Sequence, residues 1–353
     1  MSKTDLLSLL PQELEQYVIS IGEPKYRAKQ LFTQMHKGTS PAEMTNISKA
    51  TKQKLDEEAF YYLPSIRRKL VSALDGTVKY LFGLSDGNCV ESVVMRYKHG
   101  NTICVSSQVG CRMGCAFCAS TIGGKIRDLT ASEILTQVLK AQLDMGERIS
   151  NIVMMGIGEP LDNYDNVIRF LRLVGCEDGM NIGYRHISLS TCGLVDKIDM
   201  LAREDMPITL SISLHASDDV TRSSIMPVNK KWNIEALLDA CKRYYNTTGR
   251  RISFEYTLIS GKNDTPDAAL CLAKLLNQSL RPRSRADSFP IHVNLIPVNP
   301  VDETQFSASD KQSVMKFASI LEKNGIRATV RRRLGGDINA SCGQLRREEE
   351  SKG

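Results

Sequence analysis

The sequence TICVSSQVGCRMGCAFC, residues 102–118, runs from a short apolar segment at 102–107 directly into a loop with three cysteines. Cys111, Cys115 and Cys118 follow a C-x3-C-x2-C pattern, so three thiolates on one short loop can face a common centre. A [4Fe-4S] cluster normally takes four cysteine ligands, and three would leave one iron open to a small molecule. A structural zinc site is the alternative, but it requires a fourth Cys or His, and none follows closely. The loop therefore predicts a metal centre, and the spacing favours the cluster.

Apolar strands and amphipathic helices alternate from this point to the end of the chain. The predicted strands lie near residues 102–107, 151–156, 187–191, 208–214, 252–259, 291–296 and 327–332. The predicted helices lie near residues 130–145, 163–174, 194–204, 233–247, 265–278 and 309–324. This repetition indicates an α/β fold with parallel strands and right-handed crossovers. Six such units and one further strand favour a partial or full barrel, with a doubly wound open sheet as the alternative; both bind ligands at the carboxyl ends of the strands.

Two segments precede this repeat. Residues 1–65 have apolar side chains at helical spacing and eight basic against eight acidic residues, which predicts a small helical domain without a net field for nucleic acid. Residues 66–100 have short alternating runs separated by turn signals such as Asp75-Gly76, which predicts connecting β-hairpins. The predicted domains are a helical domain at 1–65, a β-hairpin linker at 66–100, a barrel with a C-terminal loop at 101–345 and a charged tail at 346–353.

The composition is that of a globular protein, with 353 residues, 42% hydrophobic and 24% charged. No stretch approaches the roughly 20 apolar residues of a membrane span, and the first residues do not have the apolar run of a signal peptide, so we expect a cytoplasmic protein. Ten cysteines in that compartment are not expected to form a disulfide framework. The net charge of +6 is uninformative as a total, but nine basic and four acidic residues fall within 66–129. This excess, which includes Arg96, Lys98, Lys125 and Arg127, predicts where an anionic partner such as a nucleic acid would approach.

The cysteine loop resembles that of the radical S-adenosylmethionine (SAM) superfamily, whose members bind SAM at the open iron of the cluster. Five further motifs resemble those of the RlmN/Cfr family within it: MGIGEPLDNYDN (155–166), SLSTCG (188–193), SLHASDDVTRSSIMPVN (213–229), HVNLIPVN (292–299) and GGDINASCGQL (335–345). The resemblance covers nearly all of the chain. It implies a radical SAM partial (β/α)6-type barrel with an N-terminal helical domain of RNA-binding type. It also implies one [4Fe-4S] cluster held by Cys111, Cys115 and Cys118, with SAM as the second cofactor.

Polar residues at successive strand ends are the candidates for contacts with SAM. Gly158 and Glu159 end the second strand, where a glycine allows close backbone approach and a carboxylate can accept from the SAM ammonium. In the resembled family the SAM pocket is also lined by residues at five later positions in this chain: Ser190, Ser213, Leu214, His215 and Asn299. Such recurrence is what a site at the mouth of a barrel predicts.

Three residues receive catalytic roles from the resemblance alone. Cys342 lies on a glycine-containing loop and corresponds to the cysteine that carries a methyl group. Cys104, which would otherwise be interpreted as a core residue, corresponds to the resolving cysteine that forms a transient disulfide with Cys342. Glu91 corresponds to the proton acceptor, although an exposed strand glutamate is the simpler interpretation of its sequence context.

The implied reaction is methylation of carbon 2 of an adenosine in the peptidyl transferase centre of 23S rRNA and of an adenosine in some tRNAs. It consumes two SAM molecules, one to methylate Cys342 and one to generate the radical that activates this methyl group. The implied partners are 23S rRNA and tRNA, an electron donor such as flavodoxin and a thiol reductant, with the protein acting as a monomer. Cfr-like methylation of carbon 8 is the alternative, and Pro160 after Glu159 favours carbon 2. A non-catalytic metal-containing RNA-binding module is the alternative of another class.

Overall fold

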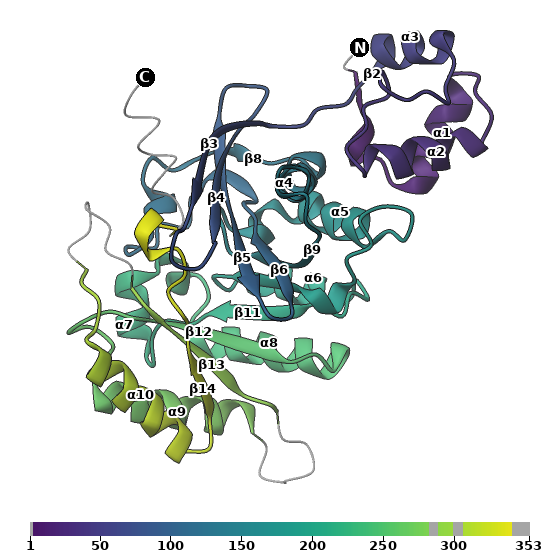
Figure 1. Ribbon diagram of the computed structural model, residues 1–353. Helices are drawn as coiled ribbons and strands as arrows, with labels where there is room; N and C mark the ends of the chain where they lie inside the picture. The colour runs from purple at the N-terminus through teal and green to yellow at the C-terminus, as the bar shows by residue number, and fades with distance from the viewer. Residues whose placement is uncertain (1–2, 282–288, 299–305, 341–353) are drawn as a thin grey trace.

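The computed structural model describes residues 3–281, 289–298 and 306–340 of the chain (Figure 1). The helices are α1 (Pro11–Ser20), α2 (Tyr26–Met35), α3 (Lys49–Glu58), α4 (Ala131–Met145), α5 (Tyr164–Gly175), α6 (Val195–Leu201), α7 (Asp219–Ile225), α8 (Ile234–Thr248), α9 (Pro266–Leu280) and α10 (Lys311–Lys323). The strands are β1 (Thr4–Asp5), β2 (Ala59–Phe60), β3 (Ser65–Val71), β4 (Val78–Gly83), β5 (Cys89–Tyr97), β6 (Gly100–Cys104), β7 (Gln108–Gly110), β8 (Lys125–Asp128), β9 (Ile149–Met154), β10 (Ile187–Thr191), β11 (Thr209–Ser213), β12 (Ile252–Leu258), β13 (His292–Pro297) and β14 (Arg327–Val330).

One large sheet forms the centre of the molecule. Its strand order is β14-β13-β12-β11-β10-β9-β6-β5-β4-β3, and the pairs from β6 to β14 are all parallel. The seven predicted strands are therefore confirmed. The described strands contain no pairing between the two outermost, β14 and β3, so the sheet is a partial barrel and not a closed one.

Helices α4, α5, α6, α8, α9 and α10 form the outer layer, and all six were predicted (Figure 1). Helix α4 illustrates how capping residues in the sequence set the two ends of a helix. The Thr130 hydroxyl accepts from the Glu133 amide while the Glu133 carboxylate accepts from the Thr130 amide, and Gly146 ends the helix in the left-handed region. Its Ile134 and Leu135 are fully buried against the sheet. The short helix α7 was not predicted, because seven residues give too little periodicity.

Strands β3, β4 and β5 extend the same sheet. They lie in the region expected to link the domains, and they pair antiparallel with one another and with β6. Figure 1 shows this hairpin rising beside the barrel, with the yellow C-terminal segment next to it. The predicted hairpins are therefore present as part of the barrel sheet, and this places Glu91 of β5 in its interior.

The N-terminal residues form helices α1 to α3 with the small parallel pair β1–β2. This unit contacts the barrel domain through polar side chains, including Arg169 with Glu13 and the Ser132 hydroxyl with Asp5. None of the helices in the described ranges combines the length and the apolar character needed to cross a bilayer.

Candidate functional site

The loop that carries the three cysteines is held by backbone contacts after β7. Gly110 has φ +78°, and a Cβ atom there would lie 1.9 Å from the Gly124 carbonyl oxygen, so only glycine fits. The next amide, of Cys111, donates to that same carbonyl at 3.1 Å. Cys111, Cys115 and Cys118 all line a cavity of about 200 Å³ at the carboxyl ends of the strands. The sequence prediction that they face a common space is therefore consistent with the geometry.

The chemistry of these thiols fits a cluster. Burial raises the pKa of the Cys111 thiol to about 12, and burial also raises that of Cys115, with the neighbouring cysteines adding to both shifts. Such thiols become thiolates only when a positive centre binds them. Within the described residues, no three His, Cys, Asp or Glu side chains are placed so that they could hold a single metal ion. Three cysteine thiols that line one cavity are a donor set of the kind that holds an iron–sulfur cluster.

The Gly158-Glu159 turn follows β9 and lines the same cavity. Gly158 has φ +108°, and a Cβ atom there would lie 2.7 Å from the side chain of Gln108. Glu159 is buried and accepts from the amides of Leu161 at 3.1 Å and Cys192 at 2.7 Å, one on each carboxylate oxygen. Burial raises the pKa of Glu159 while these bonds oppose the shift. The side chains of Thr191 and Cys192 are further hydrogen-bond partners of this carboxylate, which therefore ties the turn to the end of β10.

His215 follows β11 in a strained backbone conformation, with φ +57°. Its carbonyl accepts from the Asn263 side chain at 2.7 Å, and its Nδ1 accepts from the Thr257 amide at 2.9 Å. Burial, followed by the charge of Arg222, lowers the pKa of His215 to about 3, so the ring is neutral. Nδ1 is the acceptor, so Nε2 carries the proton, and Phe117 packs edge-on against the ring at 5.0 Å between centroids.

The other residues predicted to contact SAM do not all line this cavity. Ser190 and Ser213 line the cavity with His215. Leu214 is fully buried in the hydrophobic core, and its amide donates to the Glu255 carbonyl. Asn299 and Cys342 lie outside the described residues.

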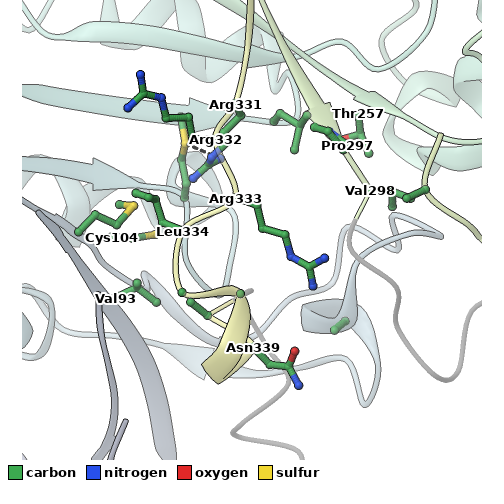
Figure 2. A pocket seen from close by; sticks show the side chains of 18 of the residues that line it. Val93, Cys104, Thr257, Pro297, Val298, Arg331, Arg332, Arg333, Leu334 and Asn339 are labelled. Atoms are coloured by element: carbon green, nitrogen blue, oxygen red, sulfur yellow. Dashed lines mark hydrogen bonds between the residues drawn. The ribbon is translucent and has the colours of Figure 1, made fainter. Parts of the chain in front are cut away.

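A second, larger cavity of about 400 Å³ adjoins the first. Cys104 of β6 lines it together with residues of the loop 331–340 that follows β14. Figure 2 shows Cys104 and Leu334 on one wall, Thr257 and Pro297 on the other, and Arg333 extending between them. The two cavities share six lining residues: Phe117, Cys118, Met155, Thr257, Ile296 and Arg331. Cys104 and the cysteine loop therefore face one continuous space.

Glu91 is neither exposed nor part of either cavity lining. Its side chain is 2% exposed, and Oε2 lies 3.1 Å from Nζ of Lys79, which is 1% exposed. It shares a strand face with Val93 and Met95, which do line the larger cavity. The simpler interpretation of the sequence, an exposed strand glutamate, is therefore wrong. Glu91 lies two residues before Val93 on the same face of β5, next to the part of that face that lines the larger cavity.

Sequence reasoning missed Glu255. It lies on β12, lines the smaller cavity and accepts from the Asn294 side chain at 2.7 Å. Burial raises its pKa. The signal was an acidic residue within the otherwise buried run ISFEYTL (252–258).

Sequence reasoning also missed Arg222, which has no exposed surface. Its guanidinium donates to the carbonyls of Cys192 at 2.8 Å, Ser213 at 3.1 Å and Leu214 at 3.1 Å, and to the Asn229 side chain at 2.8 Å. It therefore fastens the carboxyl ends of β10 and β11, which line the smaller cavity. Arg222 lies within a quoted motif, but nothing in its spacing indicated burial.

Replacing Arg222 by methionine is expected to destabilise the protein by about 3–5 kcal/mol, because four buried oxygen acceptors lose a charged donor. Urea unfolding measures the change. The matched control is Arg243→Met, which removes a half-exposed ion pair with Asp199 and should cost about 0–1 kcal/mol. Equal losses in the two variants would show that Arg222 does not fasten the strand ends.

Two family models match the chain. The model of the radical SAM superfamily matches residues 105–270, and the model of the ribosomal RNA large subunit methyltransferase N-terminal domain matches residues 4–60. The two matches together cover the helical N-terminus and most of the barrel.

Similar proteins match over nearly the whole chain. A protein of Clostridium acetobutylicum named probable dual-specificity RNA methyltransferase RlmN is 51% identical over 352 residues, which cover 99% of each chain. A protein of Clostridium tetani with the same name is 53% identical over 97% of this chain and 96% of its own. The crystal structure of a radical SAM methyltransferase from Sphaerobacter thermophilus has a TM-score of 0.89 at 41% identity, and covers 97% of this chain and 98% of that one.

Proposed function

Because the chain belongs to the RlmN family of radical SAM methyltransferases, we propose that it methylates carbon 2 of adenosine in 23S rRNA and in some tRNAs. The observation that carries this proposal is the continuous space between the cysteine loop and Cys104. A radical generated at the loop would need to reach a methyl group near Cys104 without crossing solvent. The two cavities adjoin and share six lining residues, so they provide such a path inside the protein. The proposed domains are the helical unit at 1–65, the hairpins at 66–100 and the barrel from 101 onward.

Cys111, Cys115 and Cys118 are the proposed cluster ligands, and Glu159, Ser190, Ser213 and His215 surround the proposed SAM position. When bound, the cluster supplies the electron that cleaves SAM to a carbon radical. The neutral His215 keeps a positive charge away from the SAM sulfonium, while the buried carboxylates Glu159 and Glu255 favour a cationic ligand.

The remaining roles belong to residues around the larger cavity. Carbon 2 of adenine is electron-poor and has no nucleophilic lone pair, so direct transfer from the sulfonium is unreasonable. We assign Cys342 as the residue that carries the methyl group, and Ala340, two residues earlier, lines the cavity. Cys104 would attack the Cys342 sulfur to form a transient disulfide and release the methylated base. Glu91 would accept the carbon 2 proton.

The direct test is anaerobic incubation of cluster-reconstituted protein with SAM, a reductant and RNA, followed by digestion of the RNA and mass spectrometry. The proposal expects 5′-deoxyadenosine and 2-methyladenosine. Detection of 8-methyladenosine would establish the Cfr-like reaction instead. If the cluster-loaded protein yields neither product, it acts as a metal-containing RNA-binding module.

We infer that RNA meets a surface other than the one that the charge count predicts. Arg96 pairs with Glu147, Lys125 with Asp162 and Arg127 with Asp86 and Glu133, so most of the charge near the hairpins is already neutralised within the protein. Arg332 and Arg333, by contrast, are exposed at the larger cavity, and their side chains form no ion pair with any described residue. These two guanidinium groups are available to bind phosphates beside a base that enters the cavity.

Changing Arg332 and Arg333 together to glutamine is expected to weaken RNA binding and to reduce the slope of log affinity against log salt by about 1.5, as for two lost phosphate contacts. Fluorescence titrations across a salt series measure this slope. The matched control, Arg96→Gln with Arg127→Gln, should change it by less than about half as much because both side chains are paired in the protein. A larger effect in the control would show that RNA binds near the hairpins, as the charge count predicts.

The proposed partners beyond RNA are an electron donor such as flavodoxin and a thiol reductant that restores Cys104 and Cys342 after each turnover. A monomer is proposed as the working form. We also propose that the reaction takes place in the cytoplasm, where ribosomal and transfer RNA are found.

A further inference from the structure

The turn between β3 and β4 is bonded to the loop 331–340 by three hydrogen bonds. The Ser72 hydroxyl and the Ala73 amide donate to the two oxygens of Asp337, at 2.7 and 2.9 Å. In the opposite direction, the Gly335 amide donates to Asp75 at 2.8 Å. These contacts join residues about 260 positions apart, so the hairpin holds the C-terminal wall of the larger cavity.

A fourth contact comes from the interior of the hairpin. Lys79 lies on β4, and its Nζ donates to the Asn339 carbonyl at 3.0 Å while it lies 3.1 Å from the Glu91 carboxylate. Asn339 and Ala340 line the larger cavity. The lysine therefore touches the proposed proton acceptor on one side and the cavity loop on the other.

A lysine buried this completely requires a reason. The side chains of Lys79 and Glu91 are 1% and 2% exposed, and burying two charges costs more than a surface pair returns. An apolar pair of the same volume would serve stability as well or better. A general base has to point at the proton that it removes. An ammonium group 3.1 Å from the Glu91 carboxylate supplies a counter-charge inside the protein and fixes the position of that carboxylate.

We propose that Lys79 is a positioning residue of the active site, which holds the Glu91 carboxylate in place and fixes the loop 331–340 against it. This inference rests on the proposed function, because Glu91 matters as a proton acceptor only if carbon 2 of adenosine is the target. Lys79 itself lines neither of the two cavities. It acts through Glu91 and through the Asn339 carbonyl.

The test compares Lys79→Met with Lys69→Met, which removes a partly exposed lysine from the neighbouring strand β3 and its pair with Asp144. Lys79→Met is expected to lower RNA methylation about 100-fold, within the range for loss of a positioned base, while methylation of the protein by SAM and formation of 5′-deoxyadenosine persist. RNA covalently attached to protein should accumulate on denaturing gels, because the step that fails follows addition to the base. Lys69→Met should show none of these changes.

A second measurement does not depend on the reaction. Amide hydrogen exchange of residues 335–340 should increase about tenfold in Lys79→Met, as expected for loss of one hydrogen bond from a charged donor, and should not change in Lys69→Met. Unchanged exchange, or RNA methylation within about threefold of wild type, would overturn the proposal. Equal loss of SAM cleavage and RNA methylation would also overturn it, since the defect would then be general.

The paired variant covers the case in which Lys79→Met alone does not fold. Glu91→Gln combined with Lys79→Met leaves no unpaired buried charge, and it should match Glu91→Gln alone within about twofold, because the lysine has no carboxylate left to support. A further loss in the double variant would mean that Lys79 acts independently of Glu91. Absence of methylated RNA from the wild-type protein would instead refute the proposed function, and the hydrogen-exchange comparison would then decide the positioning role by itself.

Discussion

Cys104→Ala is expected to stop turnover after one event and to leave the RNA covalently attached to the protein. Cys104 lies at the end of β6, buried among Val93, Met95 and Leu334 at the wall of the larger cavity. If Cys342 carries the methyl group, the methylated base remains bonded to that sulfur until another thiol attacks it. Without Cys104 no described cysteine lines this cavity except Cys118, which is a proposed cluster ligand. Denaturing gel electrophoresis with labelled RNA would show at most one attached RNA per chain.

The control for this variant is Cys271→Ala, which removes an exposed cysteine on α9 and should turn over normally. The assignment fails if Cys104→Ala releases methylated RNA over many cycles without an adduct. Loss of SAM cleavage in the same variant would also count against it, because the resolving step comes after radical formation.

Cys118→Ser is expected to abolish the radical cleavage of SAM. Cys118 lines both cavities, so its proposed cluster would lie at their junction. A hydroxyl is a poor substitute for a thiolate on iron, and even outer residues of metal sites change activity by about 10–100-fold. Formation of 5′-deoxyadenosine should therefore fall at least about 100-fold, and the visible absorption of the reconstituted cluster should disappear.

Cys176→Ser is the matched control, because Cys176 is partly exposed after α5 and lines neither cavity. It should retain iron, sulfide and SAM cleavage at wild-type levels. If Cys118→Ser keeps a full cluster and cleaves SAM, the ligand set must include a different residue.

Much of the barrel could be predicted from the sequence, because most of its strands are short apolar runs between helices. Helices α4, α8, α9 and α10 also begin at a capping side chain. The run at 252–258 is fully buried, and its boundaries follow directly from composition. Whether the sheet closes into a full barrel depends on the pairing of its outermost strands. The hydrophobic periodicity of the sequence does not indicate which strands pair. The hairpins were identified by their turn residues, but nothing local indicated that β5 would pair with β6.

The site could be predicted only where its residues lie close together in the sequence. Cys111, Cys115 and Cys118 share one loop, so their spacing alone predicted that the three thiols face one site. The partnership of Lys79 and Glu91 depends on the register between β4 and β5 and on a loop about 260 residues away. The charge excess near the hairpins was visible in the sequence, but its neutralisation by Glu147 and Glu133 required the folded structure.

The hydrogen bond from Ser72 to Asp337 has a consequence for how the chain is made. A ribosome synthesises the hairpin 265 residues before it synthesises Asp337, so for most of translation the hairpin side chains have no partners from this loop. Contacts of such high sequence separation form late, since a large loop must close before they contribute. A nascent chain that ends before residue 331 would have Lys79 and Glu91 without the Asn339 carbonyl. Residues 331–340, which are synthesised long after the hairpin, therefore complete the wall of the larger cavity.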